Sequence, residues 1–398
     1  ALDLKAPKTN PTFTGTVSGI DKTMVGLANV DNTSDVNKPV SIAQQAALNL
    51  KAALNGSATQ DFNAASINGN AIGLGNRILN GGFLVNQRGV GGVAGDSIYV
   101  ADMWRTANSS AINGFVNFGT NYNGPVSNNG NRGAYVQTAT VKSTLASTDY
   151  VAYIHNIEGF NVADLLYGTA SAKPITITFR AQATQTTTIC VSLRNGVPNR
   201  MYTAPITLAA GTNTYSVTIP GDTSGTWDST NGLGLGILFV YACGAALHNA
   251  AANSWGTSGA FGHSSASNIL DTASRAVIIA DIQLEKGSVS TPYSRRPISE
   301  ELAMCQRYFE TGVEPTMYIG TPAVYTDIAY GSVLFKVTKR SAASVTAVDW
   351  AYFSEGANTA FTPALYNGSA SGFSFQGIGL TRWNGWTGVG TWTASSEL

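Results

Sequence analysis

The sequence predicts a mainly β protein with three parts: an N-terminal stalk with one short helix, a central antiparallel β-sandwich of the jelly-roll type, and a β-rich C-terminal domain. Short runs of alternating apolar and polar residues recur from Ile78 onward, each bounded by Gly, Asn, Pro or Asp. Helical periodicity is confined to two short segments. Separated strands, few helices and long polar loops are typical of antiparallel sandwiches. We place the domains at 1–75, 76–298 and 299–398.

The stalk is predicted from its low content of large side chains. Residues 1–75 contain two aromatic residues, Phe13 and Phe62, which is too little for a compact core. Ser41 and Gln44 form a capping-box pattern, and the apolar residues that follow at 4-3-4 spacing are Ala43, Ala47, Leu50 and Leu54. This stripe predicts a two-heptad coiled coil that needs partner chains, because one such helix is marginal in water. The alternative is a single amphipathic helix packed on its own chain.

The strands of the central and C-terminal domains are predicted from period-2 alternation. The clearest central strands are 175–181, 189–193, 215–219 and 233–243. Those of the C-terminal domain are 332–337, 344–348 and 372–377, and a short strand is predicted at 11–17 in the stalk.

A closing strand, a corner and a second helix are predicted between residues 278 and 312. The apolar side of the strand would hold Ile278, Ala280, Ile282 and Leu284, and the solvated side Asp281, Gln283 and Glu285. Pro292 and Pro297 make the corner. Ser299 is expected to cap a short amphipathic helix with Leu302, Cys305, Tyr308 and Phe309 on its apolar face, and Gly312 to end it.

The composition limits the classes of partner. The chain has 23 basic and 23 acidic residues, and charged residues are 12% against a usual ~25%. This balance gives no electrostatic argument for nucleic acid, an anionic membrane or an acidic polymer. The sequence shows no signal peptide and no apolar run near the ~20 residues of a membrane span. We expect neither nucleic-acid binding nor membrane insertion. An uncharged, hydrogen-bonding surface suits carbohydrate contact and also plain structural fibres.

No metal or cofactor site is expected. Three cysteines, at positions 190, 243 and 305, are too few and too far apart for a disulfide scaffold or a zinc cluster. We expect buried free thiols in a protein made in a reducing cytoplasm. The three histidines, His155, His248 and His263, show no ligand spacing.

Two motifs carry a resemblance to a known family. The first reads N-R-I-L-N-G-G-F-L-V-N-Q-R-G at 76–89, followed by Asp102 and Trp104; the second reads I-Q-L-E-K-G-S-V-S-T-P at 282–292, followed by R-P, E-L and C-Q-R-Y-F-E up to Glu310. Together they resemble bacteriophage and prophage tail-fibre proteins, and residues 25–41 resemble a repeated stalk segment of such fibres.

The resemblance implies a homotrimer in the virion, made in the host cytoplasm. It also implies attachment to the baseplate or another tail protein through the N-terminal region. The attachment region is expected either to be missing from this sequence or to be supplied by a partner protein. Within the motif, Trp104 is expected in the core.

Candidate glycan-binding residues are loop-borne indoles with polar neighbours, because a flat aromatic face stacks on a sugar ring. The first group is Arg382, Trp383, Asn384 and Trp386, and the second is Trp227 and Trp255. The alternative is that these tryptophans fill the core or a trimer interface.

Catalysis is not expected. A polysaccharide depolymerase would need paired carboxylates, and the pairs Glu158 with Asp164 and Asp281 with Glu285 arise readily by chance. No G-x-S-x-G elbow and no long internal repeat is present. The sequence therefore predicts a trimeric, non-enzymatic adhesin for a bacterial surface polysaccharide, lipopolysaccharide or capsule. The alternatives are a depolymerase or esterase tail spike and a purely structural baseplate fibre.

Overall fold

The computed structural model describes residues 75–93, 95–121, 126–127, 130–314, 328–354, 357–360, 362–366, 368–378 and 388–398. Before residue 75 it describes 15, 18–19, 21, 23–26, 41–49, 66–67 and 70–71. The chain divides into two compact units, Ala1–Ala64 and Ala65–Leu398. None of the described helices is long and apolar enough to cross a bilayer.

The first unit contains helix α1, Ile42–Asn49. Its N-terminus has the predicted capping box: Gln44 N donates to Ser41 Oγ at 3.2 Å, and Ser41 N donates to Gln44 Oε1 at 3.3 Å. The rest of the proposed seam, Leu50 and Leu54, lies outside the described residues, as does most of the strand predicted at 11–17. The trimeric coiled coil stays a prediction.

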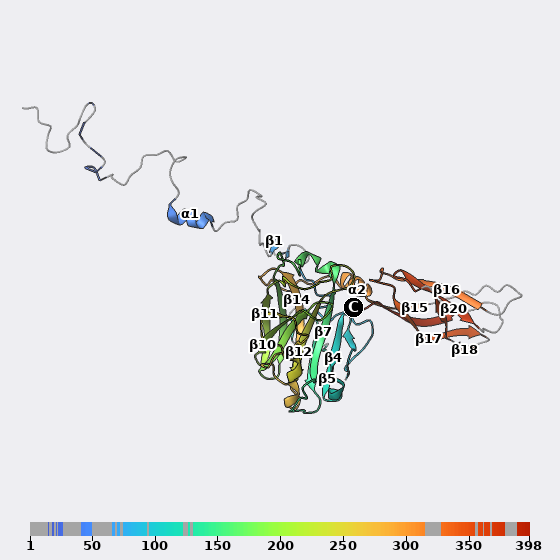
Figure 1. Ribbon diagram of the computed structural model, residues 1–398. Coiled ribbons are helices and arrows are strands. Elements are labelled where there is room, and N and C mark those ends of the chain that lie inside the picture. The colour runs from blue at the N-terminus through green and yellow to red at the C-terminus, as the bar shows by residue number, and fades with distance from the viewer. Residues whose placement is uncertain are drawn as a thin grey trace, which may run out of the picture. The chain divides into compact units, whose positions relative to one another are not determined.

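The second unit is built on two antiparallel sheets, and the predicted jelly-roll-like sandwich is confirmed. The seven-stranded sheet has the order β13-β10-β9-β12-β7-β4-β3. Its strands are β3 (Tyr99–Ala101), β4 (Trp104–Asn108), β7 (Tyr150–Glu158), β9 (Thr187–Arg194), β10 (Met201–Leu208), β12 (Leu233–Cys243) and β13 (Trp255–Gly256). Figure 1 shows these strands in the body of the second unit.

The five-stranded sheet has the order β11-β8-β14-β6-β5. Its strands are β5 (Val116–Asn121), β6 (Gly133–Thr138), β8 (Ile175–Ala183), β11 (Gly211–Ile219) and β14 (Ala276–Lys286). A short hairpin, β1 (Ser66–Ile67) with β2 (Asn70–Ala71), precedes the sandwich. The 3₁₀ helices of this region are η2 (Ser110–Ile112), η3 (Gly159–Asn161), η4 (Ala163–Leu165), η5 (Ala245–Leu247) and η6 (Ile269–Asp271).

The core fills the space between the two sheets. Trp104 is fully buried there, as expected, with its ring centroid 5.0 Å from that of Phe83 and 4.7 Å from that of His155. Burial lowers the pKa of His155 to about 3, so the imidazole is neutral at pH 7. The indole nitrogen of Trp104 donates to Asn80 O at 3.1 Å. Trp104 therefore joins the first sequence motif to the sandwich core.

The alternation predicted for the closing strand β14 is correct for Ile282 and Leu284, but it is wrong in its phase before the bulge and in its solvated face. Asp281 has φ +51°, and a bulge between Ala280 and Gln283 shifts the register against β8. Val277 and Ile279 therefore enter the core before the bulge, and Ile282 and Leu284 after it.

The polar side of β14 is buried by distant partners. Asp281 accepts hydrogen bonds from Ser127 Oγ at 2.8 Å and from Asn131 Nδ2 at 2.7 Å. Gln283 accepts from Ser294 N at 2.7 Å, and Glu285 accepts from Thr291 N at 3.0 Å. All three side chains are nearly inaccessible to solvent. The predicted solvated face is thus a buried polar layer beneath the corner.

The second helix is shorter than predicted. Helix α2 runs from Ile298 to Gln306, with Pro297 rather than Ser299 at the N-cap. The chain changes to strand β15 (Phe309–Glu314) before Gly312. Tyr308 and Phe309 continued the apolar pattern of the helix because both are buried, although they lie where the chain passes from the helix into the strand.

The C-terminal strands form two further antiparallel sheets around a second core. The first has the order β15-β21-β17-β18 and the second β16-β20-β19. Their remaining bounds are β16 (Ile328–Leu334), β17 (Ser344–Ser354), β18 (Ala357–Ala360), β19 (Ala364–Tyr366), β20 (Gly372–Ile378) and β21 (Gly388–Ser395). The core contains Trp350, Trp392, Phe373 and Phe375, all nearly inaccessible.

The two sequence motifs meet at one polar network. Asn76 Oδ1 accepts from Leu284 N at 3.2 Å, and Asn80 Nδ2 donates to Asp102 O at 2.9 Å. From the second motif, Arg296 donates to Asn76 O and to Ile78 O, and Glu301 accepts from Asn80 N. The motifs therefore mark one folding junction, which explains their residue types without catalysis.

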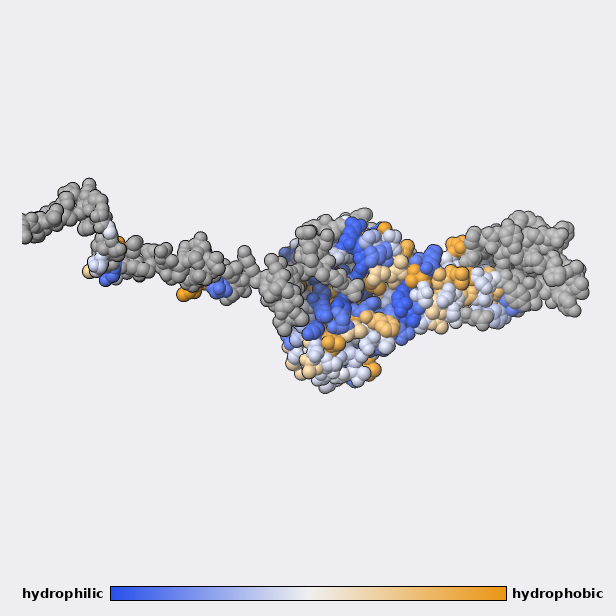
Figure 2. Space-filling view, turned by 90° about the horizontal axis from the view of Figure 1, so that it is seen from above, coloured by the Kyte–Doolittle hydropathy of each residue, from blue (hydrophilic) through white to orange (hydrophobic). Residues whose placement is uncertain are grey.

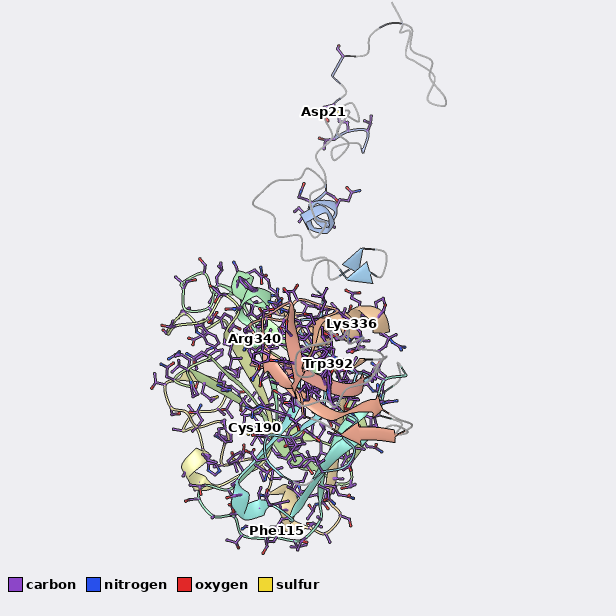
Figure 3. All side chains as sticks on the ribbon, turned by 90° about the vertical axis from the view of Figure 1, so that its right-hand side faces the viewer. Asp21, Phe115, Cys190, Lys336, Arg340 and Trp392 are labelled. Carbon is purple, nitrogen blue, oxygen red and sulfur yellow. The ribbon has the colours of Figure 1, made fainter. Side chains whose placement is uncertain are left out.

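The same junction ties the C-terminal sheets to the sandwich. Arg307 forms a two-bond ion pair with Glu158, at 2.6 and 2.8 Å. Arg340 Nη1 donates to Asn231 O at 2.8 Å, and Asn156 Nδ2 donates to Leu398 O at 2.8 Å. Figure 3 shows Phe115 at the end of the sandwich that lies away from Arg340.

The three thiols are free and buried, as predicted. Burial raises the pKa of Cys190 to about 12 and that of Cys243 to about 11, and it also raises the pKa of Cys305. Because the thiolate is the reactive species, we expect no labelling of the folded protein by a thiol reagent at pH 8. All three should react after denaturation. Rapid labelling of the folded protein would contradict this burial.

Candidate functional site

The outer face of the seven-stranded sheet is apolar at its centre. Alternation places Trp104, Tyr153 and Phe239 in the core between the sheets, and their sequence neighbours on the opposite face. The outward side chains form a separate cluster, which contains Ala107, Ala152, Ile154, Cys190, Leu238, Val240 and Cys243. A sheet with apolar residues on both faces requires a cover or a ligand on its outer side.

Part of this face is covered by the segment between β12 and β14. Ser192 Oγ on β9 donates to Phe261 O at 2.6 Å, and Ser267 N donates to Thr188 O at 2.8 Å. Phe261 packs edge-on against Tyr150, with ring centroids 5.4 Å apart. The segment is thus fixed over β9 and β12 and leaves the area beside it open.

A groove of about 350 Å³ occupies the open area. Its lining comes from β4, β7, β9, β10, β12 and three loops. The lining residues are Asp96, Ser97, Arg105, Ala107, Tyr150, Ala152, Ile154, Arg194, Pro198, Met201, Leu238, Gly259 and Phe261. This volume is within the range of small-ligand sites.

The depth of the groove depends on two alanines. Ala107 on β4 and Ala152 on β7 are direct cross-strand partners, and both point outward. Larger side chains at either position would fill the space between Tyr150 and Arg105. Ala107 is 5% exposed and Ala152 is fully buried, so the two alanines lie at the bottom of the groove, beneath its walls.

The rim of the groove carries polar groups. Arg105 Nη1 donates to Ser97 Oγ at 3.2 Å, and Asp96 Oδ1 accepts from Asn108 N at 2.9 Å. Burial, with the nearby Asp96 carboxylate, raises the pKa of Tyr150, so its hydroxyl stays protonated and can donate at neutral pH. An aromatic ring, guanidinium donors and a carboxylate around an apolar floor can bind a sugar through its ring face and its hydroxyls.

The predicted site residues Trp227 and Trp255 lie together at another place. Their ring centroids are 5.4 Å apart, and Tyr167 contacts both, at 4.8 and 5.9 Å. The indole of Trp227 donates to Ser224 O at 3.0 Å and that of Trp255 to Pro220 O at 2.7 Å. Both are half-buried against the sandwich core.

The surroundings of this aromatic cluster leave little space. The hollow beside Trp227 measures about 40 Å³, which is close to the volume of one water molecule. Asp222 is bound by Arg200 through two hydrogen bonds of 2.7 Å. A glycan-binding role for Trp227 and Trp255 stays a prediction. Arg382, Trp383, Asn384 and Trp386 lie outside the described residues.

The carboxylates considered for catalysis are held apart by separate partners. Burial raises the pKa of Glu158, but hydrogen bonds from Arg307 and Tyr308 outweigh this effect and hold the pKa below its ordinary value. Asp164 is paired with Arg77 at 2.6 Å and with Lys286 at 3.2 Å. Among the described residues, no group of three or more His, Cys, Asp and Glu side chains could hold a metal ion.

Sequence reasoning did not find the groove. Arg105, Tyr150, Arg194 and Phe261 lie on separate segments and match no motif. One signal was present: the first five residues of β7 and residues 237–243 of β12 are apolar at every position, not at every second one. On the face shown in Figure 2, hydrophilic and hydrophobic residues form small interspersed patches.

No family model matches the chain, and no curated protein matches it in sequence. Among solved structures, it is similar to the enzymatically active domain of tailspike protein 4 of bacteriophage CBA120, with 10% identity and a TM-score of 0.27 over 53% of this chain and 21% of that one. The match spans about a fifth of the length of that domain.

Two carbohydrate-binding modules also match. TmCBM61, solved with β-1,4-galactotriose, has 11% identity and a TM-score of 0.28 over 53% of this chain and 98% of that one. The family 11 module of the cellulase Lic26A-Cel5E of Clostridium thermocellum has 16% identity and a TM-score of 0.26, over 51% and 98%. Because these TM-scores are low, we base the function on the groove and on the sequence motifs.

Proposed function

We propose that this protein is a phage-type tail fibre that binds a bacterial surface glycan as a trimeric, non-enzymatic adhesin. The motifs at 76–104 and 282–310 support the tail-fibre assignment by their resemblance to that family. The observation that carries glycan binding is the groove of about 350 Å³ on the outer face of the seven-stranded sheet. Its apolar floor, aromatic wall and polar rim suit a sugar.

The groove favours binding over cleavage. Glycoside hydrolysis ordinarily uses two carboxyl groups on either side of the scissile bond. Asp96 is the one carboxylate among the described residues of the groove lining. Of the other acids considered for catalysis, Glu158 and Asp164 are bound by arginine side chains. Asp281 and Glu285 are buried and accept hydrogen bonds from Ser127, Asn131 and Thr291. We therefore propose that the glycan leaves the protein with its length unchanged.

The trimer would raise the affinity that one groove supplies. Each chain carries one such groove, and three chains joined at the stalk would present three to the same polymer. Weak individual sites then give strong attachment, because the second and third contacts are intramolecular.

The first test is incubation of the purified protein with surface polysaccharides from a panel of bacteria, followed by size analysis of bound and free polymer. We expect at least one polymer to be retained at unchanged length. Shortened polymer would contradict the adhesin and favour a depolymerase. Absence of retention across the panel would favour a structural fibre.

Ala107→Trp is expected to block the groove and to weaken retention of that polymer at least tenfold. The added indole would fill part of the groove that a sugar ring needs. The matched control is Ser216→Trp, which adds the same side chain at an exposed position of β11 in the other sheet. Thermal unfolding shows whether both variants stay folded. Equal binding by the two variants would place the glycan elsewhere, for example at Trp383 and Trp386.

A further inference from the structure

The groove is more basic than the protein as a whole. The chain has no formal net charge, but two arginines, Arg105 and Arg194, line the groove against one acid, Asp96. No ion pair joins Asp96 to either arginine in the described part of the chain. Asp96 instead accepts hydrogen bonds from Ser97 Oγ and Asn108 N, at 2.9 Å each. The overall balance of charge therefore hides a local excess of positive charge.

The two arginines approach the groove from opposite sides. Arg105 is on β4 and Arg194 on β9, and β7 and β12 lie between them. With strands ~4.8 Å apart, their backbones are separated by about 14 Å. Ile154 and Leu238, which are neighbours in the sheet, form the floor between them. Two long side chains on either side of an apolar floor can close on one ligand.

The guanidinium groups have unused donors. Arg105 Nε is buried and has no hydrogen-bond partner. Arg194 Nη1 makes only long contacts, of 3.4 and 3.5 Å, to Asn195 O and Gly196 O. Burial, together with the charge of Arg105, lowers the pKa of Arg194. Two cations that repel each other at a partly dry site are both stabilised by an anion placed between them.

We infer that the groove binds an acidic sugar, whose anionic substituent lies between the guanidinium groups of Arg105 and Arg194 while its ring lies against Tyr150. This inference rests on the proposed function. A carboxylate and a phosphate present the same chemistry here, because both accept paired hydrogen bonds from a guanidinium group. The ligand class is thus a glycan with uronic-acid or phosphate-bearing residues.

The test uses the same bacterial polysaccharide panel, with each extract separated by anion exchange into neutral and acidic fractions. We expect the protein to retain acidic fractions, with a Kd that rises steeply with salt concentration. Carboxyl reduction of the retained fraction removes binding if the anion is a uronate, and phosphatase treatment does so if it is a phosphomonoester. Either loss supports the inference.

Two glutamine variants test whether the arginines of the groove bind the acidic glycan, and two further variants serve as controls. Arg105→Gln and Arg194→Gln should each weaken retention of the acidic fraction roughly tenfold or more, as expected for loss of a charge-assisted hydrogen bond. Lys173→Gln removes the same charge at an exposed position that is not part of the groove lining, and should change little. Arg105→Lys keeps the charge but loses the planar fork, so we expect an intermediate loss.

The outcomes separate this inference from the proposed function. Retention of neutral fractions with equal affinity, or acidic binding that is insensitive to both arginine variants, overturns the inference and leaves glycan binding in place. No retention of any fraction overturns the proposed function itself. The salt dependence and the fractionation use the unmodified protein. They therefore show whether the protein prefers acidic glycans even where a variant fails to fold.

Discussion

Trp104→Ala is expected to lower the free energy of unfolding by about 3–5 kcal/mol, the usual cost of removing a large aromatic side chain from a core. Trp104 is fully buried and contacts Phe83, His155 and Phe239. Its loss also leaves Asn80 O without the indole donor. Urea unfolding followed by far-UV circular dichroism gives the change.

The matched variant is Trp104→Phe, which keeps an aromatic ring and removes the hydrogen bond and part of the volume. We expect it to lose about 1–3 kcal/mol, less than the alanine variant. If both variants unfolded at the same urea concentration as the wild type, Trp104 would not support the core as the structure indicates.

Lys339→Met is expected to destabilise the C-terminal sheets by about 3–5 kcal/mol, because it leaves a buried carboxylate without its cation. Lys339 and Glu310 are fully inaccessible at their side chains and form an ion pair. The ammonium group also donates to Gln306 O at 2.6 Å and lies 4.6 Å from the centre of the Phe335 ring. Chemical unfolding followed by tryptophan fluorescence measures the loss.

A double variant distinguishes a missing partner from a missing side chain. Replacing both groups, as in Glu310→Leu with Lys339→Met, removes the uncompensated charge and should restore a large part of the stability. A double variant as unstable as the single one would mean that packing, not charge, dominates at this position.

Regular alternation was sufficient to predict much of the sandwich. The runs at 175–181 and 233–243 became β8 and β12, the second with identical bounds. The prediction for β14 failed because a bulge depends on the neighbouring strands. Asp281 adopts a positive φ in the structure, and no local pattern indicated this. Its burial depends on Ser127 and Asn131, about 150 residues earlier in the chain.

The candidate site was harder to predict than the fold. Loop-borne indoles were the expected sugar contacts. Trp227 and Trp255 pack against each other and against Tyr167, and their binding role stays a prediction. The groove is lined by other residues, which include Tyr150, Phe261 and two arginines from different strands. Only the pairing of β4, β7, β12 and β9 brings these residues together, and strand order cannot be read from alternation alone.

The junction at α2 has a mechanical consequence. Strands β15 and β21 pair along Phe309–Glu314, and both are attached to the sandwich: β15 follows α2, and the residues after β21 bind Arg88 and Asn156. A force that pulls on the C-terminal sheets is therefore shared by two connections, one through β15 and one through β21, which are hydrogen-bonded to each other. One connection would allow the sheets to swivel, whereas two resist twisting. The attachment thus transmits torque as well as tension.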